Sequence, residues 1–246
     1  MITLENLTKI YRGIKAVDNV SLNVPQGTIF GFIGPNGAGK TTTIKMMAGL
    51  LQPTRGKIYI NGLEIAKEPS KVKKIIGFIP DRPFLYEKLS GIEFLRFKAG
   101  LYGMKENRLG EKIAELLNIF ELRDWGDELI ESYSHGMKQR LIIASAIIHK
   151  PRVIIVDEPM VGLDPKGAKL VKEIFQEWAD DGATVFMSTH TLALAQEVCQ
   201  QIAIVNKGRI VASGTSEDLK KQAGIEGNLE SIFLTITGGQ SLGENV

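Results

Sequence analysis

Residues 34–41, Gly-Pro-Asn-Gly-Ala-Gly-Lys-Thr, match the pattern G-x-x-x-x-G-K-[ST] of a phosphate-binding loop. This motif requires a strand before it and a helix after it, and the apolar stretch 28–33 and the helical stretch 40–50 meet that requirement. Glycine lets the backbone turn through positive φ, so that successive N–H groups point at phosphate oxygens, and the start of a helix adds its positive dipole end. The motif therefore predicts an α/β unit that binds the phosphates of a nucleotide.

Two side chains of the motif carry the expected chemistry. Lys40 is expected to reach the β and γ phosphates, and the Thr41 hydroxyl to give Mg²⁺ a hard oxygen ligand. A glycine-rich turn with a chance lysine is the alternative, but the pattern arises by accident in about one chain in a hundred of this length. The loop alone leaves kinase, GTPase and ATPase open. The expected nucleotide contacts are Gly34, Pro35, Asn36, Gly37, Ala38, Gly39, Lys40, Thr41 and Thr42.

A second element, RVIIVDE at 152–158, reads as a buried strand that ends in two carboxylates. Ligands bind in α/β proteins at the carboxyl ends of such strands. Asp157 is placed to hold Mg²⁺ through water, and Glu158 to orient and deprotonate the attacking water. A strand capped by solvated acids is the alternative. Beside a phosphate loop, the two carboxylates indicate nucleotide hydrolysis.

Hydrophobic patterns divide the chain into regions. Short strands with turns in residues 1–33 predict an antiparallel, β-rich start. Residues 89–150 contain no good strand candidate and carry apolar residues at helical spacing, including Leu109, Ile113 and Leu116. Later apolar runs suit strands buried on both faces of a parallel sheet, alternating with helices. The expected parallel strands are 57–62, 75–79, 152–158, 183–189 and 202–206, and the expected helices between them are 166–180 and 191–200.

These patterns predict an α/β fold: a P-loop NTPase core with a mainly parallel sheet, an N-terminal antiparallel β subdomain and an inserted helical subdomain. One domain is expected over 1–246. Residues 1–88 and 151–224 would form the nucleotide-binding core with the β subdomain, and 89–150 the helical subdomain. Residues 225–246 would form a tail in which LESIFLTI is a short helix, followed by a polar stretch that frays.

Composition limits the possible partners and compartment. The net charge is +2 without a run of like charges, so no nucleic-acid partner is expected. Cys199 is the only cysteine, which excludes an internal disulfide and fits a reducing compartment. The longest apolar runs, such as 141–148, are too short to span a bilayer. We therefore expect a cytoplasmic protein.

Residues 132–140, SYSHGMKQR, lie between the two nucleotide-binding elements. With them, the chain resembles the ATP-binding subunits of ATP-binding cassette (ABC) transporters, whose signature usually reads L-S-G-G-Q. In isolation the segment would be an ordinary helix cap. The resemblance implies that Ser134 and the N–H groups near Gly136, at the head of helix 136–149, contact the γ-phosphate of ATP bound to a second copy. Three signature positions depart from the family, namely Tyr133, His135 and Met137.

The same resemblance gives roles to four further residues. Tyr11 matches an aromatic that stacks on adenine, although plain packing is the alternative. Asp164, in VGLDP, matches an aspartate at the dimer interface, and His190 matches the histidine that touches the γ-phosphate and holds the catalytic water in place. Asp81 stands where the family has a glutamine that reaches Mg²⁺ or the attacking water. The shorter, charged aspartate is expected to contact the metal directly, to act through water, or only to couple to the membrane partner.

The resemblance implies an ATPase that drives a separate membrane permease, most consistent with export. Two copies are expected to sandwich two ATP molecules head to tail, on the cytoplasmic face of the membrane. ATP binding closes this dimer and hydrolysis opens it. The expected groove for a permease helix lies in the region 84–102, with the aromatic residues Phe84, Tyr86, Phe94, Phe97 and Tyr102. Core packing is the alternative for most of these residues.

Two rival readings remain at this stage. A soluble cassette protein that acts in translation or DNA maintenance usually carries two cassettes or a long coiled coil, and no heptad run is present here. A nucleotide-binding module that has lost catalysis is disfavoured by Glu158 and His190.

Overall fold

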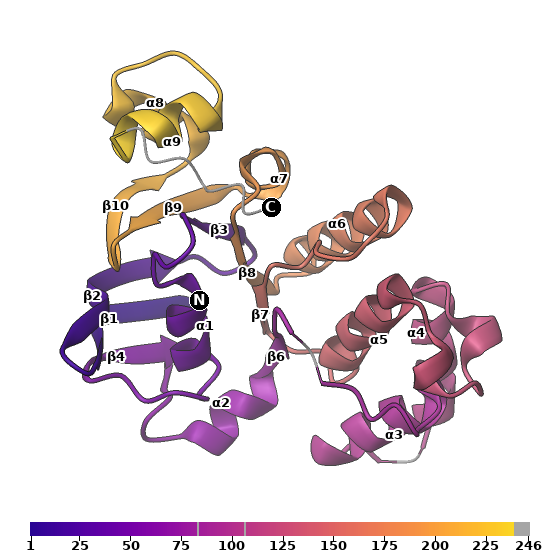
Figure 1. Ribbon diagram of the computed structural model, residues 1–246. Coiled ribbons are helices and arrows are strands. Elements are labelled where there is room, and N and C mark those ends of the chain that lie inside the picture. The colour runs from indigo at the N-terminus through magenta and orange to yellow at the C-terminus, as the bar shows by residue number, and fades with distance from the viewer. Residues whose placement is uncertain (83, 106, 239–246) are drawn as a thin grey trace.

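Two β-sheets form the body of the protein, and a helical lobe extends from one of them (Figure 1). The computed structural model describes residues 1–82, 84–105 and 107–238. The first sheet is antiparallel, with strand order β2-β1-β4-β5. Its strands are β1 (Ile2–Tyr11), β2 (Ile14–Val24), β4 (Arg55–Ile60) and β5 (Leu63–Glu64).

The pattern of β1 shows why this segment forms a one-sided strand. Ile2 and Leu4 are buried and alternate with less buried residues, as one face of a sheet requires. The pairing with β2 shifts between Leu4 and Leu7, and Asn6 has a φ of 48° there. This bulge inserts one residue and returns Leu7 to the buried face.

The second sheet is parallel except at one edge, with strand order β10-β9-β3-β8-β7-β6. All residues of β3 and of β7 are buried, because helices cover both faces. The carboxyl ends of β3, β7 and β8 meet at one edge, where the nucleotide-binding motifs begin. The strands are β3 (Ile29–Ile33), β6 (Ile76–Ile79), β7 (Val153–Asp157), β8 (Thr184–Thr189), β9 (Gln201–Asn206) and β10 (Arg209–Gly214).

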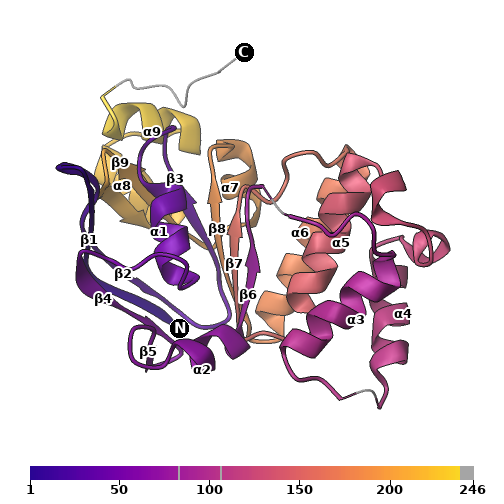
Figure 2. The same cartoon turned by 60° about the horizontal axis from the view of Figure 1, so that its bottom comes forward.

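Helices fill the space on both sides of the parallel sheet. Figure 2 shows α1 between the two sheets, where Ile44 and Met47 share a core with Leu4 and Phe30. On the other face, α6 packs with α5 through a core that includes Phe175. The helices outside the lobe are α1 (Lys40–Met47), α2 (Pro69–Ile75), α6 (Pro165–Asp180), α7 (Leu192–Val198), α8 (Ser216–Ala223) and α9 (Leu229–Ile236).

The lobe consists of α3, α4 and α5 with two short 3₁₀ turns. Ser90 starts α3 with a capping box, because its hydroxyl accepts from the Glu93 N–H and the Glu93 carboxylate accepts from the Ser90 N–H. The bounds are α3 (Gly91–Leu101), α4 (Leu109–Ile119) and α5 (His135–Ile147), with the 3₁₀ turns at Arg123–Trp125 and Ile130–Ser132.

The α/β class with an antiparallel subdomain and a helical insertion is confirmed, but two strands lie in the other sheet. The stretch 57–62 was expected in the parallel sheet and instead forms β4, paired with β1. The stretch 28–33 was expected in the antiparallel region and forms β3, at the centre of the parallel sheet. Short apolar runs carry no information about the partner strand, which explains both errors.

The C-terminal part contains one expected helix and two elements that the patterns missed. The stretch LESIFLTI forms α9, as expected, and Ile232 and Phe233 are buried against α7 and α8. The strand β10 and the helix α8 were not anticipated. The expected fraying concerns residues after 238, which lie outside the described part of the chain. Within the described residues, none of the helices has the length and apolar character to cross a membrane.

Candidate active site

A cavity of about 500 Å³ lies at the carboxyl edge of the parallel sheet. Segments far apart in the sequence supply its walls: the phosphate loop, the end of β1, the residues after β6, β7 and β8, and the loop after Glu158. Most of the residues expected to bind nucleotide therefore share one cavity. Its lining residues are Tyr11, Ala16, Asn36, Gly37, Ala38, Gly39, Lys40, Thr41, Thr42, Asp81, Glu158, Val161 and His190.

Two glycines of the phosphate loop are required by close backbone contacts. A methyl group on Gly34 would lie 2.2 Å from the carbonyl oxygen of Val205. A methyl group on Gly39 would lie 2.4 Å from the carbonyl oxygen of Ala16, and the φ of Gly39 is 101°. Both distances are far below van der Waals contact. The loop can keep this curled shape only because these positions carry no side chain.

Lys40 is buried at the base of the loop. Its Nζ donates to the carbonyl oxygens of Gly34 at 2.7 Å and of Pro35 at 3.2 Å. Burial lowers the pKa of Lys40, while the charges of Glu158 and Asp157 oppose that shift. A phosphate bound in the loop would further stabilise the charged ammonium group.

The first turn of α1 has free donors. Gly39 precedes this helix and provides no side-chain cap. The hydroxyl of Thr43 donates to the Gly39 carbonyl oxygen at 3.0 Å, whereas Thr41 is exposed to the cavity. The N–H groups of this turn and the Thr41 hydroxyl are therefore accessible to an anion and to a metal ion.

Asp157 and Glu158 are consecutive but have different environments. Asp157 is buried at the end of β7 and accepts a hydrogen bond from the Ser188 hydroxyl on β8. Glu158 has a φ of 54°, in the left-handed region, and its N–H donates to the Ser188 carbonyl oxygen at 3.2 Å. This costly backbone conformation turns Glu158 out of the strand and into the cavity.

His190 follows β8 and lies beside Glu158. Its Nδ1–H is placed to donate to Oε1 of Glu158, at 2.9 Å. The carboxylate of Glu158 is mostly covered, whereas the imidazole is exposed. The histidine thus fixes the orientation of the carboxylate and still faces the cavity.

Tyr11 and Asp81 also line the cavity. The Tyr11 ring is 44% exposed, so it is available for stacking rather than enclosed in the core. The carboxylate of Asp81 lies 3.9 Å from Nε of Arg82 and lines both this cavity and a groove beside the helical lobe.

The donor set fits Mg²⁺ better than a metal held by protein ligands alone. Among the described residues, no group of three or more His, Cys, Asp or Glu side chains is placed to hold a metal ion. Mg²⁺ typically takes one or two carboxylates, a hydroxyl and phosphate oxygens. Thr41 and Asp81, which line the cavity, and Asp157, at the end of β7, offer only oxygen ligands, as that ion prefers.

Ser134, Gly136 and Asp164 do not line the cavity. Ser134 caps α5, since its hydroxyl accepts from the Met137 N–H at 3.3 Å. Asp164 caps α6 by accepting from the Gly167 N–H at 3.0 Å. The phosphate loop and the signature residues 133–137 are thus separate within one chain.

The tyrosine at the first signature position has a structural explanation. Tyr133 is buried, and its hydroxyl donates to the Trp125 carbonyl oxygen at 2.5 Å. Its hydroxyl occupies the space that a methyl group on Gly91 would need. This departure from the family pattern therefore anchors the signature to the start of α3.

Sequence reasoning missed Ser188, which binds Asp157 directly. The available signal was the expected pairing of two parallel strands, because residues at the same height on adjacent strands become neighbours. Asp157 and Ser188 are paired in the register of β7 and β8.

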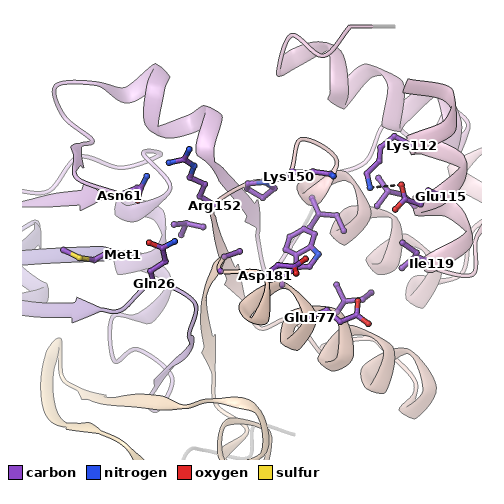
Figure 3. A pocket seen from close by; sticks show the side chains of 18 residues that line it. Met1, Gln26, Asn61, Lys112, Glu115, Ile119, Lys150, Arg152, Glu177 and Asp181 are labelled. Atoms are coloured by element: carbon purple, nitrogen blue, oxygen red, sulfur yellow. Dashed lines mark hydrogen bonds and ion pairs between the residues drawn. The ribbon is translucent and has the colours of Figure 1, made fainter. Parts of the chain in front are cut away.

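A second cavity, of about 610 Å³, lies at the opposite edge of the parallel sheet (Figure 3). Met1 and Asn61 face it from the antiparallel sheet, and Lys112 and Glu115 face it from α4. Lys112 forms an ion pair with Glu115 at 2.9 Å. None of the residues expected to bind nucleotide lines this cavity, so its larger volume does not indicate the reaction site.

The fold and the first cavity define a phosphate-loop nucleotide hydrolase. Comparison with known proteins then gives the family: residues 17–161 match the ABC transporter family, and the chain belongs to it. It is an ATP-binding and ATP-hydrolysing subunit of a transporter, and its partners are a second ATPase subunit and a permease.

Individual relatives agree with this assignment. The chain is 40% identical to the daunorubicin/doxorubicin resistance ATP-binding protein DrrA of Streptomyces peucetius, over 91% of this chain and 68% of that protein. It superposes with a TM-score of 0.91 on the ATP-binding subunit of an ABC transporter, at 35% identity, covering 96% of this chain and 99% of that one. A dimeric cassette in a post-hydrolysis state bound to ADP and Pi gives a TM-score of 0.81 at 27% identity, over 87% and 98% of the chains.

Proposed function

We propose that this protein hydrolyses Mg²⁺-bound ATP between two head-to-tail copies and thereby drives a separate permease in the export direction. The observation that carries the proposal is the pair formed by Glu158 and His190 in the same cavity as the phosphate loop. In this proposal the protein lies peripherally on the cytoplasmic face of the membrane.

Each residue of the cavity has a role in the proposed reaction. Lys40 and the N–H groups of the loop bind the β and γ phosphates, and Tyr11 stacks on adenine. Glu158 accepts a proton from the attacking water, while His190 holds the carboxylate and contacts the γ-phosphate. Thr41 and Asp157 hold Mg²⁺, which when bound neutralises charge on the phosphate oxygens. Asp81 lines the same cavity and would contact the ion directly, act through water, or only couple to the permease.

Two copies complete the site because part of the machinery lies elsewhere in each chain. Ser134 and Gly136 stand at the exposed N-terminal end of α5, whose N–H groups favour an anion. In a head-to-tail dimer this helix end contacts the γ-phosphate held by Lys40 of the other copy, and Asp164 lies at the interface. The dimeric cassette bound to ADP and Pi supports a dimer as the working form.

The groove beside the helical lobe is the proposed permease site. Phe84 is 79% exposed and packs edge to face on Tyr86 at 5.5 Å between ring centroids, and Tyr86 packs on Phe97 at 5.4 Å. Three aromatics named from the sequence do not line it: Phe97 packs beside it on Tyr86, Phe94 is buried and Tyr102 stacks on His149. The groove is lined by Asp81, Arg82, Phe84, Leu85, Tyr86, Glu87, Lys88, His135, Lys138 and Gln139.

Similarity to DrrA, whose name gives resistance to daunorubicin and doxorubicin, supports export as the direction. The cargo would contact the permease rather than this chain. A role in translation or DNA maintenance is not favoured, since the relatives found are transporter subunits.

The substitution Glu158→Gln tests the proposal. It keeps the shape of the side chain and removes the base, so ATPase activity should fall by about 10²-fold or more while ATP binding persists. The variant should accumulate as an ATP-bound dimer in size-exclusion chromatography. Glu173→Gln, on the exposed surface of α6, is the control and should retain activity. Equal ATPase rates for wild type and Glu158→Gln would reject the proposed base.

A polytopic membrane protein that co-purifies with the chain from membranes would identify the permease. Co-sedimentation with ribosomes instead would favour the translation role.

A further inference from the structure

Two side chains of α5 lie against the loop that joins the proposed catalytic base to Asp164. His135 and Gln139 are four residues apart, so they project from the same face of the helix. The segment they contact, called the 158–164 loop, contains Glu158 at one end and Asp164 at the other.

Gln139 holds the beginning of this loop. Its side chain is buried, and Nε2 donates to the Pro159 carbonyl oxygen at 3.4 Å. Pro159 directly follows Glu158, whose left-handed φ of 54° is an unfavourable conformation for this residue. Such a conformation persists only where the surroundings hold it, and a buried amide that needs a partner provides that restraint.

His135 holds the middle of the loop. A methyl group on Gly162 would lie 2.1 Å from Cδ2 and 2.2 Å from Nε2 of His135, so the imidazole lies directly against the Gly162 backbone. Gly162 has a φ of 82°, and a methyl group on Gly136 would lie 3.5 Å from its carbonyl oxygen. The first turn of α5 thus packs on the loop two residues before Asp164.

The backbone hydrogen bonds inside the loop are about as long as the one from Gln139, and Met160 and Leu163 add apolar contacts with the core. These hydrogen bonds measure 3.4 Å from the Val161 N–H to the Glu158 carbonyl oxygen and 3.2 Å from the Leu163 N–H to the Met160 carbonyl oxygen. Val161, between them, is exposed. The loop lacks regular secondary structure, so contacts from α5 with its backbone add restraints that no strand or helix ladder supplies there.

We propose that His135 and Gln139 are positioning residues that hold the 158–164 loop in the geometry needed for hydrolysis. This inference rests on the proposed roles of Glu158 and Asp164. It gives the unusual histidine of the signature a function within its own chain. Both residues also line the groove, so a permease segment bound there would touch the side chains that position the base.

Hydrogen exchange of the isolated protein tests the restraint directly. His135→Ala and Gln139→Ala should each speed exchange of the amides in the 158–164 loop and leave the amides of the phosphate loop unchanged. His135→Phe keeps a flat ring over Gly162 and should restore slow exchange. Unchanged exchange in both alanine variants would overturn the inference whatever their ATPase rates.

ATP hydrolysis tests the consequence for catalysis. The alanine variants should lower kcat by about tenfold, as a misplaced base does, with KM for ATP within about twofold of wild type. Lys166→Ala is the matched control, because Lys166 lies close to Asp164 in sequence but directs its ammonium to Glu121 at 2.6 Å. Normal kcat in His135→Ala and Gln139→Ala would contradict the inference.

A double-mutant cycle tests whether His135 acts through Gly162. Gly162→Ala should lower kcat by a larger factor in the wild type than in His135→Ala, where no imidazole meets the new methyl group. Equal factors would reject this contact as the route. Failure of the proposed function would give a different result, because the wild type itself would then show no ATP turnover above that of Glu158→Gln. Hydrogen exchange would still show whether His135 and Gln139 restrain the 158–164 loop.

Discussion

The phosphate loop and the signature each lead into the N-terminal end of a helix, and they differ in what surrounds them. The phosphate loop before α1 faces Tyr11, Glu158 and His190 in one cavity. Ser134 and His135, where the signature enters α5, are exposed, and the first turn of α5 packs on the 158–164 loop of its own chain.

The helix caps differ in the same way. Gly39 caps α1 without a side chain, so the N–H donors of that turn remain free. Ser134 caps α5 and already accepts from one of its N–H groups. The N-terminal end of α1 keeps free donors for a phosphate held by the same chain, whereas that of α5 has its own cap and, in the proposed head-to-tail dimer, would meet the phosphate held by another copy. The following predictions test this contrast.

The largest effect is expected for Lys40→Ala. The substitution removes the buried cation of the phosphate loop, so kcat/KM for ATP should fall by on the order of 10²–10³. Steady-state ATPase assays measure this directly. Lys45→Ala, on the exposed side of the same helix, should keep the wild-type rate. Substantial turnover by Lys40→Ala would break the assignment of this loop as the phosphate site.

Ser134→Asp should distinguish the role of the N-terminal end of α5 from that of α1. Aspartate is also a good N-cap, so α5 remains stable, but its charge repels the terminal phosphate held by another copy. In a Glu158→Gln background, ATP-driven dimerisation should weaken by about tenfold or more, while each monomer still binds ATP. Sedimentation velocity with and without ATP measures the dimer. Asn228→Asp at the start of α9 is the control, and full dimerisation of Ser134→Asp would contradict the head-to-tail site.

Ser188→Ala tests how strongly the nucleotide site depends on the hydrogen bond from Ser188 to Asp157. The change leaves Asp157 buried without its hydroxyl donor, which should cost about 1–3 kcal/mol of unfolding free energy. It should also raise the Mg²⁺ concentration needed for hydrolysis. Urea unfolding and a Mg²⁺ titration provide the measurements. Ser213→Ala, on the edge strand β10, should leave both unchanged.

The smallest effect concerns the far end of α5, where His149 joins the lobe to the core. Its Nε2–H is placed to donate to the Ile76 carbonyl oxygen at 3.0 Å, and its ring stacks on Tyr102 at 3.5 Å. Burial lowers the pKa of His149 from 6.5 to about 4, with a smaller contribution from Lys98. The unfolded state therefore binds more protons between these values, so stability should fall as pH decreases from about 6.5 to about 4.

His149→Phe should flatten this part of the pH profile in thermal unfolding, because it keeps a ring beside Tyr102 without a titrating group. An unchanged slope would show that His149 is not responsible.

Local motifs allowed much of the site to be predicted. The phosphate loop, Asp157 and Glu158 were identifiable because their chemistry requires neighbouring residues in a short segment. Tyr11 and His190 required resemblance to a family, since a single aromatic or histidine has no local pattern. Ser188 and Gln139 were missed because their partners lie 31 and 20 residues away in the chain.

The errors in the fold have the same origin. Strand segments were found where apolar residues cluster, but β4 and β3 were given to the wrong sheets. Pairing is decided by contacts with β1 and with β8 and β9, respectively. The apolar pattern within a strand indicates how buried the strand is, but not which strand pairs with it.

The amino-acid sequence by itself determined the chemistry that this chain can perform, because glycines, a lysine and carboxylates at fixed short spacings already imply phosphate binding. Only the tertiary structure decided which of these groups meet. It joined His190 to Glu158, Ser188 to Asp157 and α5 to the 158–164 loop, and it kept Ser134 away from Lys40's cavity. The physical reason is that covalent spacing controls contacts over a few residues, whereas contacts across the sheet depend on how the strands and helices pack.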